Sequence, residues 1–326
     1  MFKALVLEQQ DKITQASVQT IDETTLPEGD VLVAVDYTSL NYKDGLAITG
    51  AGRIIRNFPM VPGIDLVGKV LESQDDRYQV GDEVVLTGWG VGETHWGGMA
   101  EKARLKGDWL VPMPANFDGK KAMMVGTAGL TAMLCVQALI DADIKPEDGE
   151  VLVTGASGGV GSVAVSLLAK LGYTVAAVSG RVEENGPLLT KLGASRVIER
   201  SEFEEPARPL DKQLWAGAID TVGSKVLAKV LSQVNYNGAV AICGLAGGFD
   251  LPTTVMPFIL RNVRLQGVDS VMCPREKRMA AWDRLVELLP EQYYQQACNE
   301  ISLEQAPEAA AKIIKGQVTG RTVIKL

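Results

Sequence analysis

The sequence is poor in the residues that most often bind metal ions or carry out redox chemistry. It has a single histidine, His95, and four cysteines at widely separated positions, Cys135, Cys243, Cys273 and Cys298. No two cysteines form a C-x-x-C pair, which argues against a zinc ribbon or a redox dithiol. The single histidine argues against histidine-rich metal sites and against a histidine-dependent triad. Scattered single thiols are typical of a reducing cytoplasm, where we expect this protein to reside.

The sequence also lacks an excess of basic residues and a long apolar run. Its net charge of -8 argues against a general role on nucleic acid or on a membrane surface, although a local basic patch for a phosphate remains compatible with it. No apolar run approaches the ~20 residues that cross a bilayer. Residues 1–12 have too short an apolar stretch for a signal peptide and no small-residue cleavage site. The length of 326 residues predicts about two domains.

The first ~120 residues have the pattern of a β-rich domain. Short apolar or alternating segments predict strands at residues 2–7, 31–37, 67–71 and 83–86. Turn signals such as Pro62-Gly63 separate them. Many short strands with glycine punctuation predict a small barrel-like domain.

After Pro114 the pattern changes to alternating helices and strands. Apolar helical segments fill residues 119–142, and an apolar run at 151–154 predicts a strand buried on both faces. Spacings of three and four predict a helix over 160–171 that ends at Gly172. Further segments continue the alternation, with strands at 174–178, 196–198, 218–221, 239–243 and 263–268 and helices at 187–192 and 274–289. This alternation predicts an α/β fold with a doubly wound parallel sheet, and we expect the strand-like tail at 320–326 to return to the first domain.

The turn between the strand at 151–154 and its helix has the glycine pattern of a dinucleotide site. The stretch Gly155-Ala156-Ser157-Gly158-Gly159-Val160-Gly161 contains A-x-G-x-x-G. Such a turn needs a small residue to bend, a glycine for approach to the pyrophosphate and a glycine for helix–strand packing. The phosphates then meet the free N–H groups of the helix. Ala156 departs from the three-glycine form, and an ordinary glycine-rich turn is the alternative.

The end of the next strand distinguishes between the two nicotinamide cofactors. NAD enzymes usually carry a carboxylate there for the ribose 2′-OH, but this strand ends in Val178-Ser179-Gly180-Arg181. Ser179 can donate to a 2′-phosphate and Arg181 can pair with it. We therefore predict NADPH, against the alternative that Arg181 is a solvated surface residue. The loop Gly244-Leu245-Ala246-Gly247-Gly248 leaves a later strand and is predicted to approach the nicotinamide half; a flexible surface loop is the alternative.

These motifs resemble the medium-chain dehydrogenase/reductase superfamily over nearly the whole chain. The shared landmarks are residues 62–68, 80–84, 97–101 and 220–223 with the A-x-G-G-V-G turn. Within the superfamily the chain resembles the YhdH/AcuI group of acryloyl-CoA reductases and quinone-oxidoreductase-like proteins, through residues 39–44, 87–93, 95–98 and 251–258.

The resemblance implies a fold, a reaction and an assembly. It implies a GroES-like catalytic domain from residues 1–122 and 273–326 around a Rossmann domain at 123–272, reduction of acryloyl-CoA to propanoyl-CoA with NADPH, and a homodimer. Zinc members place a cysteine where Asn41 stands here and Gly-His-Glu where Gly63-Ile64-Asp65 stands. The absence of a cysteine or histidine at these positions implies chemistry without zinc.

Hydride addition to an activated double bond suits such a site, because the developing enolate needs only hydrogen-bond donors and a proton. Tyr42 and Asn41 are the catalytic candidates, with a packed tyrosine and a turn asparagine as the alternatives; Asp44 is expected to hold local structure. His95 is a weaker proton-donor candidate, and Arg53 and Arg56 are candidates for the phosphates of CoA. The predicted cofactor-binding set is Tyr42, Ala156, Ser157, Gly158, Gly159, Val160, Ser179, Gly180, Arg181, Arg196, Leu245, Ile259 and Ser270.

Two other functions remain compatible with the sequence. One is a quinone or general enone reductase on the same scaffold, because a fold does not fix a substrate. The other is a non-catalytic NADPH-binding protein.

Overall fold

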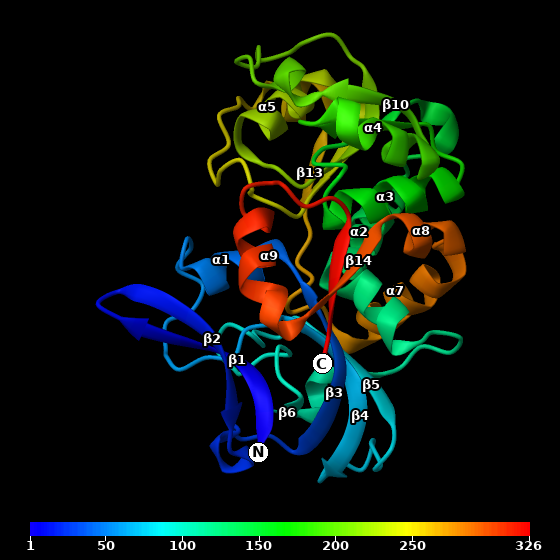
Figure 1. Ribbon diagram of the computed structural model, residues 1–326. Coiled ribbons are helices and arrows are strands. Elements are labelled where there is room, and N and C mark those ends of the chain that lie inside the picture. The colour runs from blue at the N-terminus through cyan, green and yellow to red at the C-terminus, as the bar shows by residue number, and fades with distance from the viewer. The chain divides into compact units, whose positions relative to one another are not determined.

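The computed structural model describes residues 1–326, which form two compact units (Figure 1). The first unit contains residues 1–127, 270–286 and 298–326, and the second contains residues 128–269 and 287–297. From the sequence we expected boundaries at 122/123 and 272/273. In the structure the first boundary lies at 127/128 and the second at 269/270, and residues 287–297 also belong to the second unit.

The first unit is built on a mostly antiparallel sheet. Its order is β14-β15-β3-β4-β5-β7, and β6 also pairs with β3. The strands are β3 (Val31–Leu40), β4 (Asp65–Ser73), β5 (Glu83–Thr87), β6 (Lys102–Leu105), β7 (Leu110–Pro112), β14 (Cys298–Ser302) and β15 (Arg321–Lys325). Because β15 pairs with β3, the expectation that the tail returns to the first domain is confirmed.

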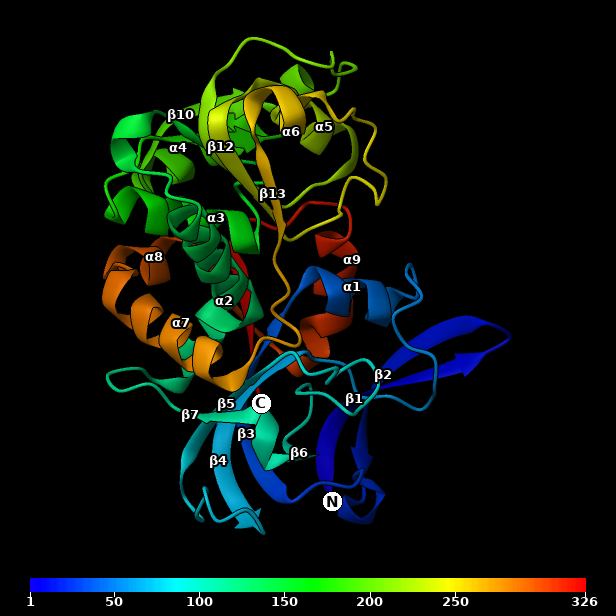
Figure 2. The ribbon, with the colours of Figure 1, turned by 180° about the vertical axis from the view of Figure 1, so that it is seen from behind.

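A hairpin and two helices complete this unit. The hairpin joins β1 (Phe2–Gln10) to β2 (Ile13–Ile21) through Asp11 and Lys12, both with positive φ. Helices α1 (Tyr42–Thr49) and α9 (Ala306–Ile313) lie side by side in both ribbon views (Figures 1 and 2). Gly45 makes this approach possible, because a Cβ there would lie 2.6 Å from the Ile313 side chain.

The second unit contains the predicted parallel sheet. Its order is β10-β9-β8-β11-β12-β13, with every neighbouring pair parallel. The strands are β8 (Val151–Val153), β9 (Val175–Ser179), β10 (Ala194–Glu199), β11 (Trp215–Asp220), β12 (Val234–Ile242) and β13 (Arg264–Gly267). The strand order reverses between β8 and β11, and in such sheets ligands bind at the carboxyl ends of the strands at that point.

Helices cross over between these strands. They are α3 (Gly159–Lys170), α4 (Val182–Lys191), α5 (Ser224–Gln233) and α6 (Met256–Arg261). Helix α5 buries Val226, Leu227, Val230 and Leu231 in one core cluster with Leu152 of β8. Helix α4 begins five residues before the predicted start, so Pro187 lies inside it rather than at its first position.

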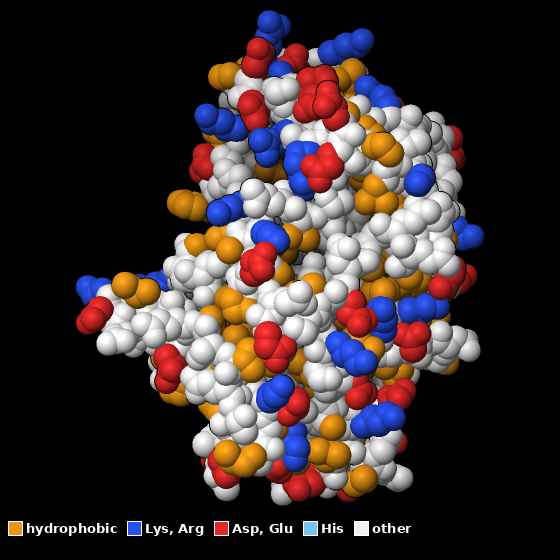
Figure 3. Space-filling model, viewed as in Figure 1, with side chains coloured by type: hydrophobic (Ala, Val, Ile, Leu, Met, Phe, Trp, Pro, Cys, Tyr) orange, Lys and Arg blue, Asp and Glu red, His pale blue; other side chains and the backbone are white.

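The remaining helices are α2 (Gly119–Asp141), α7 (Arg275–Leu288) and α8 (Glu291–Gln296). Helix α2 is broken at Gly126, whose φ of 51° and ψ of -156° are not helical. Helix α2 is long and apolar enough to cross a membrane, which corrects the expectation that no segment of the chain has that length and composition. However, 72% of its most apolar window is buried inside the structure, as in the core helix of a globular protein. Acidic and basic side chains are intermixed on the face seen in Figure 3.

Candidate functional site

The glycine turn of the second unit leaves the start of α3 open to a ligand. Gly158 is the N-cap of α3 in extended conformation, and no side chain caps the helix. The first N–H groups of a helix have no partner within it, so these are available to an anion. Gly161 has the predicted packing role, because a Cβ there would lie 2.4 Å from the Gly155 carbonyl oxygen. Gly155 has a φ of +57°, and a Cβ there would lie 2.2 Å from Thr221 Oγ1.

Beside this turn lies a corner with two guanidinium groups. Ser179, at the end of β9, is 2% exposed, and its Oγ lies 3.4 Å from Ser157 Oγ. The backbone N–H of Arg181 donates to Ser179 Oγ at 3.2 Å. Arg200 was not in the predicted set, yet its guanidinium covers Gly180, where a Cβ would lie 3.1 Å from Arg200 Cζ. Each guanidinium also contacts a glutamate on its own segment, Glu184 for Arg181 and Glu204 for Arg200.

The structure does not bring Arg196 to this corner, and here the predicted set needs correction. Its Nε and Nη2 donate to the two carboxylate oxygens of Glu150 at 2.9 and 2.8 Å. Glu150 immediately precedes β8, so this pair lies at the amino end of the sheet, whereas the glycine turn follows the carboxyl end of β8. Arg200 follows the carboxyl end of β10, at the edge of the sheet where the glycine turn lies.

The loop after β11 is fixed against the start of the glycine turn, and the loop after β12 is fixed against the loop after β11. Buried Asp220 accepts hydrogen bonds from Thr154 Oγ1 and from the Gly223 N–H, both at 2.7 Å. Burial raises the pKa of this carboxyl. Gly247 N donates to Val222 O at 2.8 Å, which holds the predicted Gly244–Gly248 loop against the loop after β11. The loop is therefore anchored at the carboxyl edge of the sheet, and its approach to the nicotinamide half stays a prediction.

The other predicted cofactor residues differ in exposure. Leu245 is 62% exposed on this held loop, and Ile259 is 71% exposed on α6. Ser270 is buried and belongs to the first unit.

The first unit contains a buried polar cluster around Asn41. Asn41 precedes α1, and its N–H donates to Asp44 Oδ2 at 2.9 Å, as in a capping box. Its side-chain amide donates to Asp65 Oδ2 at 2.9 Å and accepts from Arg321 Nη1 at 3.0 Å. Ser39 Oγ donates to Asp65 Oδ2 at 2.5 Å and accepts from Arg321 Nη2 at 2.8 Å. All five side chains are less than one tenth exposed.

The break in α2 lies against this cluster. A Cβ at Gly126 would lie 2.5 Å from Asp65 Oδ2 and 2.8 Å from Arg321 Nη2, so only glycine fits. The next residue, Thr127, donates its N–H to Asp65 at 3.0 Å and also bonds through its hydroxyl. Asp65 therefore holds the start of the second half of α2 as well as Asn41.

Asp44 is the buried carboxyl with the largest departure from its ordinary pKa in this unit. Its Oδ1 accepts from the N–H groups of Gly63 and Ile64 at 3.2 and 3.1 Å. Burial, together with the neighbouring charge of Asp65, raises the pKa of Asp44 to about 7, against the lowering effect of its hydrogen bonds with Asn41 and Ile64. The residue expected only to hold local structure is thus poised to titrate near neutral pH.

The structure gives the other candidates different surroundings. Tyr42 begins α1, is 39% exposed and has no hydrogen bond from its hydroxyl within the structure. His95 Nε2 donates to the Arg104 carbonyl at 2.8 Å, and burial lowers its pKa. Its ring also packs edge-on against Trp109, so His95 has the contacts of a structural loop residue. Arg53 and Arg56 are exposed in the loop after α1.

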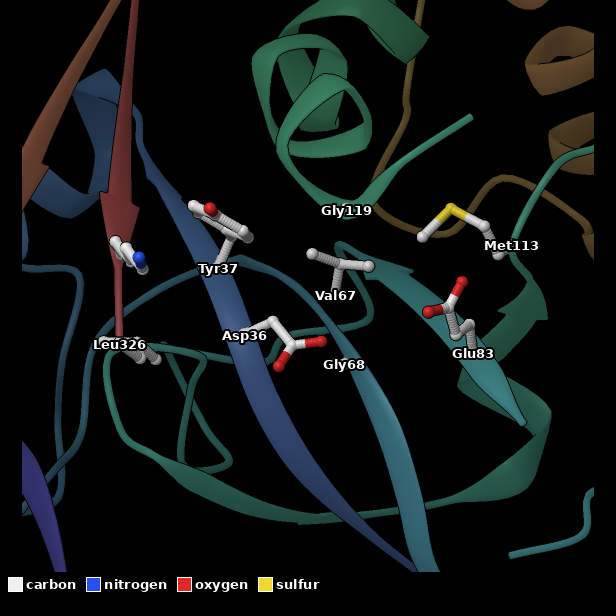
Figure 4. A pocket seen from close by; sticks show the side chains of 9 residues that line it. Asp36, Tyr37, Val67, Gly68, Glu83, Met113, Gly119 and Leu326 are labelled. Atoms are coloured by element: carbon white, nitrogen blue, oxygen red, sulfur yellow. The ribbon is translucent and has the colours of Figure 1, made fainter. Parts of the chain in front are cut away.

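A separate pocket of about 260 Å³ opens on the sheet of the first unit (Figure 4). Asp36, Tyr37 and Glu83 are among the residues that line it, and none of the predicted site residues does.

Sequence reasoning missed Ser39, Asp65, Arg321, Thr127 and Arg200 as site residues. One feature of the sequence could have identified Asp65 and Arg321, because each is a charged residue next to an apolar strand segment. The segments are Ile64-Asp65-Leu66-Val67 and Arg321-Thr322-Val323-Ile324. A charge in such a position is almost never fully buried unless it is paired.

Comparison with known proteins places the chain in a family. Residues 27–115 match the alcohol dehydrogenase GroES-like domain, and residues 159–287 match the zinc-binding dehydrogenase domain. The chain is 68% identical over 324 residues to a probable acrylyl-CoA reductase, AcuI, of Escherichia coli, with 99% of both chains covered. It is 51% identical to the acrylyl-CoA reductase AcuI of Ruegeria pomeroyi, again with 99% of both chains covered.

The fold agrees with a solved relative in the same group. The crystal structure of Escherichia coli K-12 YhdH with bound NADPH has a TM-score of 0.97 and 68% identity, covering 99% of each chain. The GroES-like sheet, the doubly wound parallel sheet and the full-length identities lead to one conclusion: this chain belongs to the medium-chain dehydrogenase/reductase superfamily, in the quinone-oxidoreductase-like group that contains AcuI and YhdH.

Proposed function

We propose that the protein uses NADPH to reduce the activated C=C bond of acryloyl-CoA, giving propanoyl-CoA and NADP⁺ with uptake of one proton. The observation that carries the cofactor assignment is the open start of α3 beside Ser179, Arg181 and Arg200. This corner has two guanidiniums for a 2′-phosphate and no carboxylate at the tip of β9. The substrate is proposed from the relatives, one of which is named an acrylyl-CoA reductase at 51% identity.

The residues of the nucleotide site bind and orient the cofactor. Backbone N–H groups at the start of α3 bind the pyrophosphate, and Gly161 lets the helix approach the strand closely. When bound, NADPH supplies the hydride that adds to the β-carbon of the unsaturated thioester. Leu245, Ile259 and Ser270 remain proposed contacts of the nicotinamide half.

The residues of the first unit are proposed to manage the charge and the proton. Hydride addition leaves negative charge on the thioester oxygen, which hydrogen-bond donors stabilise. Tyr42 is proposed as such a donor, because its hydroxyl is accessible and has no internal partner. Asn41 is already bonded to Asp65, Asp44 and Arg321, so we assign it to holding the start of α1 and with it Tyr42.

We propose that this chemistry uses no zinc. Zinc relatives place a cysteine where Asn41 stands here and Gly-His-Glu where Gly63-Ile64-Asp65 stands, so an apolar isoleucine occupies the histidine position. The carboxylate of Asp65 faces the guanidinium of Arg321 at 3.7 Å. No group of three or more His, Cys, Asp or Glu side chains in residues 1–326 is arranged to hold a metal ion. An amide and an isoleucine cannot replace the cysteine thiolate and the histidine nitrogen that bind zinc, and the carboxylate that remains is already paired with an arginine.

The binding of CoA and the assembly are proposed from surface features. Exposed Arg53 and Arg56 are the proposed contacts for CoA phosphates. A homodimer is proposed because β13 is an edge strand without a neighbour on its outer side, and the helix before it exposes Leu260. We also propose a cytoplasmic location, in keeping with four free cysteines. Light scattering of the purified protein tests the dimer, and cell fractionation tests the location.

Turnover of three substrates tests the proposed function. Purified protein is assayed with NADPH and, separately, NADH against acryloyl-CoA, a quinone and a small enone that lacks CoA. The proposal expects the highest kcat/KM with NADPH and acryloyl-CoA, and a selective loss of CoA-substrate affinity in the Arg53→Ala/Arg56→Ala variant. Higher kcat/KM on the quinone or the enone supports the general reductase, and NADPH binding with no turnover of any substrate supports a non-catalytic role.

A further inference from the structure

Arg278, on α7, is a buried cation that holds two separate backbone segments together. Its side chain is among the largest that are fully buried, with 1% exposure. Nη1 donates to the carbonyl and to the hydroxyl of Thr87 at 2.7 and 2.6 Å. Nη2 donates to the carbonyls of Ser270, Val271 and Cys273 at 3.1, 3.2 and 3.3 Å. One guanidinium thus joins the end of β5 to residues 270–273, which we call the strap.

The turn that follows Thr87 depends on the same side chain. Trp89 has a φ of +57°, a conformation that is strained for a bulky residue. Its indole Nε1 is buried without a hydrogen-bond partner, and Arg278 Cζ lies 5.0 Å from the ring centroid. The indole is therefore held by stacking against the guanidinium rather than by a hydrogen bond of its own.

The turn and the strap also contact each other directly. Trp89 N donates to Val271 O at 3.1 Å. Gly88 has a φ of +81°, and a Cβ there would lie 2.9 Å from Val271 O, so the strap passes directly against it. A strained turn persists only when its surroundings determine it, and such strain concentrates at functional sites.

Both segments that Arg278 joins lead to residues of the proposed reaction. Ser270 in the strap is a proposed cofactor contact, and its carbonyl faces Arg278. Thr87 pairs with Asp65 in the β4–β5 ladder, and Asp65 holds Asn41 at the start of α1. Arg278 therefore contacts β5, the strand that pairs with the strand of Asp65, although it lies 191 positions after Thr87 in the chain.

We propose that Arg278 is a positioning residue, whose guanidinium fixes the strap at Ser270 and the strained Trp89 turn in the geometry that hydride transfer requires. This inference rests on the proposed reductase function. Lysine is a poor replacement for arginine here, because an ammonium group has three donors where the guanidinium has five, and it has no planar face to stack on the indole of Trp89. Misplacement of reacting groups by about 1 Å can cost on the order of 100-fold in rate.

The test compares Arg278→Lys and Arg278→Met with Lys277→Met, a control on the adjacent, exposed position of α7. We expect kcat to fall on the order of 100-fold in R278M, and about 10-fold or more in R278K. The Kd for NADPH measured by titration should change by less than about threefold, because the phosphates bind the other unit. K277M should keep the wild-type kcat. If R278M does not fold, R278K alone decides the outcome.

Two further readouts separate positioning from a merely structural role. Trp89 emission, obtained as the difference between each protein and its Trp89→Phe counterpart, should shift in R278K and R278M but not in K277M. Methylguanidine added to an Arg278→Ala variant should restore part of the lost kcat. A fall in kcat that only follows the loss of folded protein, or an R278K variant with wild-type kcat and unchanged emission, overturns the proposal. If wild type does not turn over acryloyl-CoA, the proposed function fails, while the emission shift still reports on the Arg278–Trp89 contact.

Discussion

Arg321 and Asp65 face each other in the interior of the first unit, with Nη2 and Oδ2 3.7 Å apart and side-chain exposures of 2% and 0%. The hydroxyl of Ser39 bridges the two charges, since it donates to Asp65 and accepts from Arg321. The amide of Asn41 also bridges them, since its nitrogen donates to Asp65 and its oxygen accepts from Arg321. The charges are therefore joined through neutral groups, and the cluster acts as one hydrogen-bonded unit.

Arg321→Met should destabilise the protein strongly, because it leaves the Asp65 carboxylate buried without its counter-charge. Loss of one partner of a buried pair costs about 3–5 kcal/mol. The double variant Arg321→Met/Asp65→Asn should recover part of this loss, because no uncompensated charge remains. Urea unfolding of wild type, both single variants and the double variant measures the coupling; a double variant that is as unstable as the two single losses added together would contradict it.

The buried Asp44 predicts a specific pH dependence of stability. Its folded pKa of about 7 lies above the ordinary value of 3.8, so the folded state retains a proton that the unfolded chain has lost between these pH values. Stability should therefore fall as the pH rises from about 4 to about 7, by up to about 4 kcal/mol, and then level off.

Asp44→Asn provides the comparison for this prediction, because it cannot titrate. The free energy of unfolding is measured from pH 4.5 to 8 for both proteins, and the difference isolates Asp44 from all other groups. The wild-type curve should decline relative to the variant curve as pH rises. A difference that stays constant over this range, or that changes in the opposite direction, would show that Asp44 is ionised throughout in the folded protein.

The parallel sheet of the second unit was predictable because its signals are local. Strands β8, β9 and β11 are short, fully buried and mainly apolar, and Gly161 and Gly172 mark a close helix–strand approach and a helix end. The structure confirms the parallel, doubly wound sheet that this alternation predicts. The start of α4 was not predictable in the same way, because the helix includes Pro187 in its interior, and no local rule indicates that.

The buried cluster was only partly predictable because its members come from distant segments. Asn41 was found, but Asp65 and Arg321, which bond to it, and Thr127, which bonds to Asp65, come together only when β4, α2 and β15 pack. The prediction named Arg196 where the structure places Arg200, and this error has a different cause. A strand predicted at 196–198 does not fix which edge of the sheet each arginine reaches, and β10 in fact runs from Ala194 to Glu199.

The corner formed by Ser179, Arg181 and Arg200 predicts unequal effects of three arginine substitutions on cofactor binding. Arg181→Ala and Arg200→Ala should each raise the Kd for NADPH by about 10- to 100-fold, because each removes a charged hydrogen bond to the 2′-phosphate. The Kd for NADH should change by less than about threefold. Arg196→Ala is the matched control and should leave both values unchanged, since its partner Glu150 lies at the other end of the sheet. Equal losses for NADH and NADPH in the Arg181 and Arg200 variants would defeat the assignment.

Tyr42→Phe should separate catalysis from stability. The hydroxyl has no partner within the structure, so its removal should change the free energy of unfolding by less than about 0.5 kcal/mol. If the hydroxyl stabilises the enolate or relays the proton, kcat should fall by about 100-fold or more. His95→Ala should show the opposite pattern, with nearly unchanged kcat and lower stability, because its imidazole bonds the Arg104 carbonyl and packs on Trp109. Steady-state kinetics and urea unfolding of both variants make the comparison, and unchanged turnover in Tyr42→Phe would reject the proton-relay role.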